Sequence, residues 1–226
     1  MFYLKKLTSY LIITLFLWNF FSYESISLPK RLYLVLKTNI IINSQKTTID
    51  SKVWYDHNKI RVEINGMPVS NLNTDFSTTS NIIGDFDKKV IYLLNTQNKV
   101  ALRIDTSKMS QSQSVDISSP FSGSIDLRFL RKKIKELNGK MIKAEKILGH
   151  LCDVFEIPIN LPKSQEGKGK VILWFANDLS IPLKWEMYSS KSRISSTYVT
   201  QIETNAKISS DLFQIPFGYK ITDINN

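Results

Sequence analysis

The stretch VWYDHNKIRVEI, residues 53–64, decides the fold. In its second half Ile60, Val62 and Ile64 alternate with charged residues, which is the period-2 pattern of a strand with one buried face. The polar tetrapeptide DHNK, residues 56–59, separates this run from the one before it and is too short for a crossover between parallel strands. The stretch therefore predicts an antiparallel β-hairpin.

The same pattern continues along the chain. We expect strands at 32–38, 47–55, 60–65, 81–84, 90–95, 100–105, 140–148, 151–157, 170–176, 183–188 and 193–204. Val53 and Tyr55 fall on one face of their run, and Val100, Leu102 and Ile104 fall on one face of theirs. The segment KVILWFA is apolar on both faces, which is typical of a strand in the middle of a sheet.

One segment, residues 125–138, predicts a helix. Leu127, Leu130, Ile134 and Leu137 recur at helical spacing and form one apolar stripe. The other positions hold the only cluster of positive charge in the chain, Arg128, Arg131, Lys132, Lys133 and Lys135. Two interpretations remain open: a helix packed on a sheet with its basic face in solvent, or a mobile lid whose basic face meets anionic lipid.

The first 27 residues read as an export signal. Lys5 and Lys6 precede an apolar run over 11–21, and the small residues Ser25 and Ser27 follow at the spacing that a signal peptidase prefers. We expect cleavage and a mature domain over 28–226 in the periplasm or otherwise outside the cytoplasm. The alternative is an uncleaved N-terminal anchor, although the run is shorter than the roughly 20 residues of a membrane span.

Composition fits a globular α+β domain with one large antiparallel sheet. The 226 residues are 42% hydrophobic and carry a formal charge of +10. About ten strands in one sheet must curl or close, so we expect a curved sheet.

The single cysteine, Cys152, forms no internal disulfide, and its apolar neighbours predict a buried, inert thiol.

The order of segments resembles the LolA-like family of periplasmic lipoprotein carriers and outer-membrane lipoprotein-sorting proteins. The segments that carry the resemblance are VWYDHNKIRVEI (53–64), KVIYLLNTQNKVALRI (89–104), KAEKILGHLCDVFEI (143–157), VILWFANDLSIPLKWEM (171–187) and DLFQIPFGYKITD (211–223). The resemblance implies an open, incomplete β-barrel covered by a helical lid over a hydrophobic cavity that holds acyl chains. The chain departs from the carrier pattern because it has no clear N-terminal amphipathic helix before the first strand.

Catalytic motifs are not found in the sequence. Its two histidines, His57 and His150, both fall at expected turns, and there is no HExxH, no Cys/His metal spacing and no Gly-rich phosphate loop. We therefore expect no enzyme activity, no cofactor and no metal. Nucleic-acid binding is not expected, because the basic helix lacks interleaved aromatic residues.

What remains is apolar surface, which favours a monomeric binding protein for a lipid or an acyl chain, with a transient partner at the inner or outer membrane. The candidate cavity residues are Val53, Tyr55, Ile60, Val62, Tyr92, Leu102, Leu127, Leu130, Ile134, Trp174, Leu183, Trp185, Met187 and Tyr198. The first alternative is an envelope protein–protein interaction module that uses the curved sheet as a scaffold, which a filled interior would favour. The second is an enzyme on cell-envelope polymers, which converging titratable groups would favour.

Overall fold

The computed structural model describes residues 29–42, 45–65, 79–108, 127–161, 167–190 and 192–223. The expected signal peptide and most of the polar segment before the helix lie outside these residues. No helix in the described part of the chain combines the length and hydropathy needed to cross a bilayer.

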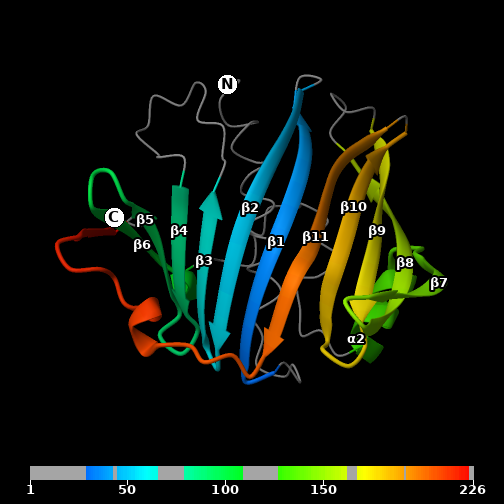
Figure 1. Cartoon of the computed structure of the whole chain (residues 1–226). Coiled ribbons are helices and arrows are strands. Elements are labelled where there is room, and N and C mark those ends of the chain that lie inside the picture. The colour runs from blue at the N-terminus through cyan, green and yellow to red at the C-terminus, as the bar shows by residue number, and fades with distance from the viewer. Residues whose placement is uncertain are drawn as a thin grey trace. The chain divides into compact units, whose positions relative to one another are not determined.

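Twelve strands make up most of the described chain (Figure 1). They are β1 (Arg31–Ile42), β2 (Gln45–Asp56), β3 (Lys59–Asn65), β4 (Thr79–Asp85), β5 (Val90–Asn95), β6 (Val100–Asp105), β7 (Lys140–Ile147), β8 (His150–Asn160), β9 (Lys168–Ala176), β10 (Ile181–Ser189), β11 (Arg193–Thr204) and β12 (Lys220–Asp223). Their hydrogen-bonded order is β12-β6-β5-β4-β3-β2-β1-β11-β10-β9-β8-β7. The order has two ends, so within the described residues the sheet does not close on itself.

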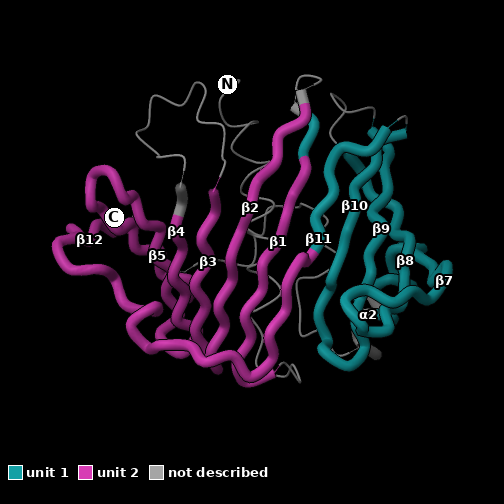
Figure 2. The backbone as a smooth tube through the Cα atoms, viewed as in Figure 1, with its two compact units in different colours: residues 1–28, 40–45, 117–198 teal, residues 29–39, 46–116, 199–226 magenta. Residues whose placement is uncertain are grey.

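The chain divides into two compact units (Figure 2). Unit 1 comprises residues 1–28, 40–45 and 117–198, and unit 2 comprises residues 29–39, 46–116 and 199–226.

In unit 2 the predicted hairpins are confirmed. Val53 pairs with Val62 in the antiparallel β2–β3 hairpin, and β4, β5 and β6 continue as antiparallel neighbours. The alternation in β3 is also confirmed, since Ile60, Val62 and Ile64 are all at most 3% exposed. β12 was not predicted as a strand, and it pairs with β6 in parallel, in contrast to the antiparallel pairs from β2 to β6.

A short C-terminal segment packs on the face of β4–β6 that carries Ile83, Leu94 and Ala101. It contains a 3-10 helix, η4 (Ser210–Phe213). Beyond it, Ile215 and Tyr219 pack against a buried cluster of Ile83, Leu94 and Ala101. A second 3-10 helix, η1 (Thr106–Lys108), follows β6.

In unit 1, β9 is a central strand as predicted. It pairs with β8 on one side and β10 on the other, and each residue from Val171 to Ala176 is at most 9% exposed. β7 and β8 form the expected hairpin, but its turn lies at Leu148 and Gly149 rather than one residue later. The reason is that His150 pairs with Ile147 and so already belongs to the ladder.

The helix α2 (Leu127–Glu136) lies within the range expected from the sequence. Its Arg131 guanidinium lies 2.6 Å from the buried carboxylate of Asp153 on β8. Gly139 follows the helix, and its amide donates to the Ile134 carbonyl. Its Cα leaves no room for a side chain, because a Cβ there would lie 2.6 Å from Ile134 and 3.0 Å from the Glu156 carbonyl oxygen. These contacts fix α2 against β8, and they do not support the expected helical lid over the sheet. The predicted cavity residues Leu127 and Leu130 have side chains outside the described part of the structure.

Candidate functional site

Two rows of side chains cross unit 2 on one face of the sheet, and we call them the apolar rows. Strand register places neighbouring residues of each row directly opposite one another, so they share a face. The first row is Val53, Val62, Ile82, Leu93 and Leu102, on β2 to β6. The second row is Tyr55, Ile60, Gly84, Ile91 and Ile104, on the same strands.

Exposure increases along the first row toward β6, and in the second row both end residues, Tyr55 and Ile104, are more exposed than the residues between them. Val53 is fully buried and Ile82 is 5% exposed, whereas Leu93 and Leu102 are half-buried. In the second row Ile60 is 1% exposed and Ile104 is half-buried. Two mainly apolar rows that are incompletely covered on β6 leave apolar surface accessible on this face.

Unit 1 carries a similar apolar face on β8–β10. Phe155, Leu173 and Trp185 lie in register across the three strands, and the next row is Ile157, Val171 and Met187. Phe155, Leu173 and Trp185 are each at most 7% exposed. Leu183 is fully buried at the register shift between Pro182 and Lys184.

The predicted site residues are divided between opposite faces. In unit 2, Val53, Tyr55, Ile60, Val62 and Leu102 all belong to the apolar rows, as the alternation indicated. Tyr92 is the exception, since it pairs with Arg103 on the other face.

In unit 1, Trp185 and Met187 share a face, but Trp174 and Tyr198 pair with Lys184 on the opposite face and so do not join them. Ile134 is 2% exposed on α2. Sequence reasoning omitted Ile82, Leu93, Ile91 and Ile104 from the site, although the alternation in their short hairpins carried the signal.

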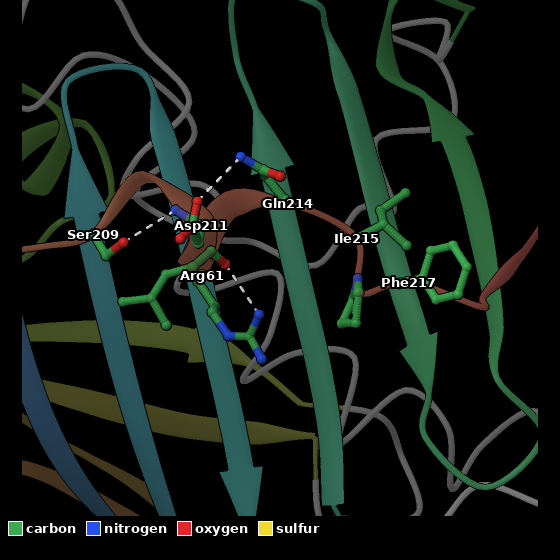
Figure 3. Close-up of a pocket in the computed structure, with 8 residues that line it drawn as sticks. Arg61, Ser209, Asp211, Gln214, Ile215 and Phe217 are labelled. Carbon is green, nitrogen blue, oxygen red and sulfur yellow. Dashed lines mark hydrogen bonds between the residues drawn. The ribbon is translucent and has the colours of Figure 1, made fainter.

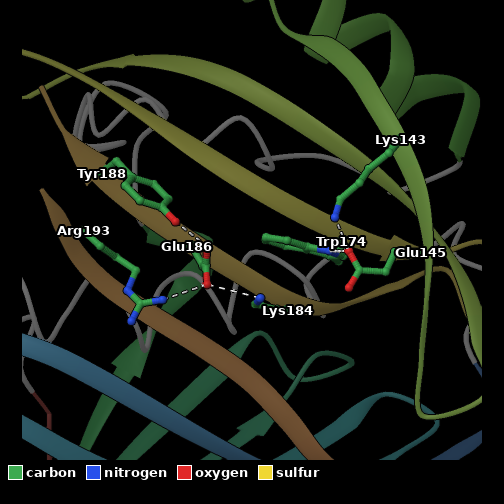
Figure 4. Close-up of polar contacts among 7 residues, drawn as sticks. All are labelled: Lys143, Glu145, Trp174, Lys184, Glu186, Tyr188 and Arg193. Atoms are coloured by element: carbon green, nitrogen blue, oxygen red, sulfur yellow. Dashed lines mark hydrogen bonds and ion pairs between the residues drawn. The ribbon is translucent and has the colours of Figure 1, made fainter.

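A network of ion pairs covers the face of unit 1 on which Trp174 lies (Figure 4). Glu186 is its centre: its carboxylate accepts from the Tyr188 hydroxyl at 2.6 Å and pairs with Lys184 and Arg193 at 3.2 and 3.1 Å. The Lys184 ammonium also lies 4.1 Å from the centroid of the Trp174 ring.

The network extends over the neighbouring strands. The Trp174 indole donates to Glu145 at 2.9 Å, and Lys143 pairs with the same carboxylate at 2.6 Å. Farther along, Glu156 pairs with Lys170 at 2.8 Å and Lys140 at 3.6 Å. Each acid of this network is therefore paired with lysine or arginine.

The pKa values of the three glutamates agree with this pairing. Burial is the largest effect on Glu186 and raises its pKa, but Tyr188, Lys184 and Arg193 together outweigh burial and hold the pKa below its usual value. The pKa of Glu145 is lowered chiefly by Lys143, and that of Glu156 chiefly by Lys170. All three groups therefore remain ionised at neutral pH.

A pocket of about 430 Å³ lies beside η4 in unit 2 (Figure 3). It is lined by Arg61, Ser209, Asp211, Leu212, Gln214, Ile215, Pro216 and Phe217. The Arg61 guanidinium donates to the Leu212 carbonyl at 3.0 Å and pairs with Glu63 at 3.0 Å. The charge at the base of this pocket thus serves to attach the C-terminal segment to β3.

The remaining titratable groups do not form a centre. Among the described residues no three histidine, cysteine, aspartate or glutamate side chains come together as a metal site would require. His57 pairs with its neighbour Asp56, and His150 lies 2.7 Å from Asp178. Cys152 is fully buried as predicted, and burial raises the pKa of its thiol to about 11.

Comparisons with known proteins give a likeness of fold alone. No protein-family model and no curated protein matches the sequence. An uncharacterized conserved protein from Thermus thermophilus is similar in structure with a TM-score of 0.52 and 8% identity, covering 96% of this chain and 99% of that one. This supports a shared fold over nearly the whole chain.

Two other solved structures are similar at TM-scores below 0.5. MucB of Pseudomonas aeruginosa, in complex with MucA, has a TM-score of 0.46 and 12% identity, covering 81% of this chain and 55% of that one. A LolA superfamily protein from Nitrosomonas europaea has a TM-score of 0.36 and 12% identity, covering 82% and 90%. Membership of the LolA-like family stays a prediction.

Proposed function

We propose that this chain is an exported, non-enzymatic binding protein that holds a lipid or an acyl chain against the apolar rows of unit 2. The observation that carries the proposal is the incomplete cover of Leu93, Leu102 and Ile104. Each CH₂ group removed from water contributes about 0.8 kcal/mol. An acyl chain of about a dozen carbons would gain on the order of 10 kcal/mol before ordering and association costs, which suffices for carriage without catalysis.

The test is binding of a fluorescent fatty-acid probe to the purified protein, together with mass spectrometry of its organic extract. We expect Leu102→Asn to weaken probe binding about tenfold or more, because it places an amide on the ligand face with no partner. Ile221→Asn on β12 is the matched control, since Ile221 is an apolar residue outside the rows and is 52% exposed. Equal probe binding by wild type and Leu102→Asn would overturn the proposal.

The full burial of Val53 and Leu183 favours a second candidate, an envelope interaction module whose sheet faces are ordinary core. On this alternative, organic extracts contain no lipid and the probe does not bind. A protein partner would then be sought by crosslinking in the native envelope.

A further inference from the structure

Exposed apolar side chains gather on the β7–β8 hairpin. Seven large hydrophobic residues are exposed in the described part of the chain, and four of them belong to this hairpin. They are Met141 (50%), Ile142 (43%), Leu148 (45%) and Leu151 (52%). Such a concentration on one short element is unusual for a surface that faces only water.

Leu148 is the least expected of the four. It occupies the first position of the two-residue turn with φ of 49°, followed by Gly149 with φ of 86°. Turns of this type favour Asn or Gly, because a bulky side chain is strained in the left-handed region. The leucine accepts this strain although 45% of its surface stays exposed, which points to a use outside the fold.

The sequence around the hairpin is basic, although Arg131, Lys140 and Lys143 are each paired with a carboxylate. Residues 127–151 hold eight lysines and arginines against two glutamates, a net +6 out of the chain's formal +10. Lys146 lies directly across from Leu151 in the ladder, so a cation and an exposed leucine are side by side near the tip. Apolar tips flanked by lysines match the interface of a bilayer with anionic headgroups.

We propose that the tip of the β7–β8 hairpin docks on an anionic lipid surface, inserting Leu148 and Leu151 while Lys146 meets the headgroups. An ion pair attaches the hairpin to α2, because Arg131 of α2 pairs with the buried Asp153 of β8. This inference does not depend on the ligand proposed for unit 2.

Addition of a partner strand to β7 fits the observations less well. β7 is an edge strand, but it carries Lys140, Lys143 and Lys146, and its register shifts at Ile142. Lysines and bulges on an edge strand oppose pairing with another strand. Every residue from 140 to 144 is exposed, so both faces of this part of β7 are accessible to lipid headgroups.

The test places an environment-sensitive fluorophore at the tip through Leu148→Cys in the full chain, with Ile221→Cys as the matched control. Vesicles of phosphatidylglycerol or of phosphatidylcholine are then added. With the anionic vesicles we expect a blue-shifted emission and a rise of about threefold or more at position 148, but not at 221, because only the tip enters the hydrocarbon boundary. Because each label reports its own position, the result holds however the N-terminal segment behaves.

A charge variant tests the headgroup contact. In the labelled Leu148→Cys protein, Lys146→Glu should raise the anionic lipid concentration for half-maximal signal about tenfold or more, since it exchanges an attraction for a repulsion. Lys207 is an exposed lysine in unit 2, and Lys207→Glu makes the same change in net charge. This control variant should not change the lipid concentration for half-maximal signal. The proposal would be overturned if the label at position 148 showed no change in emission with anionic vesicles, or if the label at position 221 responded equally. It would also be overturned if the label at 148 responded only to an added envelope protein.

Discussion

At the scale of single residues, Cys152 shows how a sequence pattern and a structure agree for one physical reason. Its neighbours in the strand are apolar, and the thiol is fully buried with its pKa raised to about 11. Charging a sulfur in such surroundings is unfavourable, so only about one thiol in a thousand is ionised at pH 8.

We therefore expect a thiol reagent to label native Cys152 at least a hundredfold more slowly than the same protein in denaturant. The Leu148→Cys variant is the control, because its added thiol lies on an exposed turn and should react at once. Rapid labelling of native wild-type protein at pH 8 would contradict the burial of this thiol.

Glu186 leads to a prediction about pH. Its pKa is lowered on folding, as are those of Glu145 and Glu156, so the folded state binds fewer protons than the unfolded state near the usual glutamate pKa. Stability from these groups is present above that pKa and is lost as pH falls through the lowered values.

Glu186→Gln should reduce the free energy of unfolding at pH 7 by about 1–3 kcal/mol, because Lys184 and Arg193 lose their shared carboxylate. The loss relative to wild type should shrink as pH falls through the lowered pKa of Glu186, because the wild-type carboxylate then becomes protonated itself. Urea denaturation over a series of pH values from 7 downward measures this difference. A difference that stays constant over the whole series would show that charge is not the cause.

At the scale of elements, the hairpins were predictable from sequence, but the face of the sheet on which some side chains lie was not. Short polar turns and alternating runs determine β2–β3 and β4–β5–β6 locally. KVILWFA in β9 is apolar on both faces, so its pattern could not show that Trp174 and Trp185 lie on opposite faces. The parallel β6–β12 pair joins segments over a hundred residues apart, which local periodicity does not encode.

The β7–β8 turn gives a prediction at this scale that separates stability from docking. Leu148→Asn should raise the free energy of unfolding by about 0.5–1 kcal/mol, because asparagine tolerates the left-handed conformation better than leucine. The same change should weaken association with anionic vesicles. Urea denaturation and vesicle co-sedimentation of one preparation measure the two effects. A destabilised variant would show that Leu148 supports the fold.

At the scale of the whole molecule, the large antiparallel sheet followed from the number of alternating runs and the scarcity of helical patterns. The helical lid was one of two interpretations of residues 125–138 and was favoured by the resemblance, but the described contacts of α2 are with β8 and do not support it. The apolar rows could be foreseen in part: period-2 alternation gave Val53, Tyr55, Ile60, Val62 and Leu102. The partial exposure of Leu93, Leu102 and Ile104 depends on what covers the sheet, and no local pattern reports that.

Ligand-linked stability is the prediction that tests the molecule as a whole. A ligand that binds only the folded state stabilises it by about 2.7 kcal/mol at a free concentration of about a hundred times Kd. For a chain of this length that corresponds to a rise in Tm of about 5–10 °C. We expect a long-chain fatty acid to produce such a rise in wild type and little or none in Leu102→Asn.

Hydrogen exchange locates the effect. Amides of β5 and β6 should gain protection when the fatty acid is added, because the half-exposed ends of the apolar rows lie on these strands. Amides of the β7–β8 hairpin should stay unchanged, since the lipid-surface contact proposed for that tip needs a bilayer and not a single acyl chain. Protection that appeared on the hairpin instead would place the acyl chain in unit 1 and remove the apolar rows from consideration as its site.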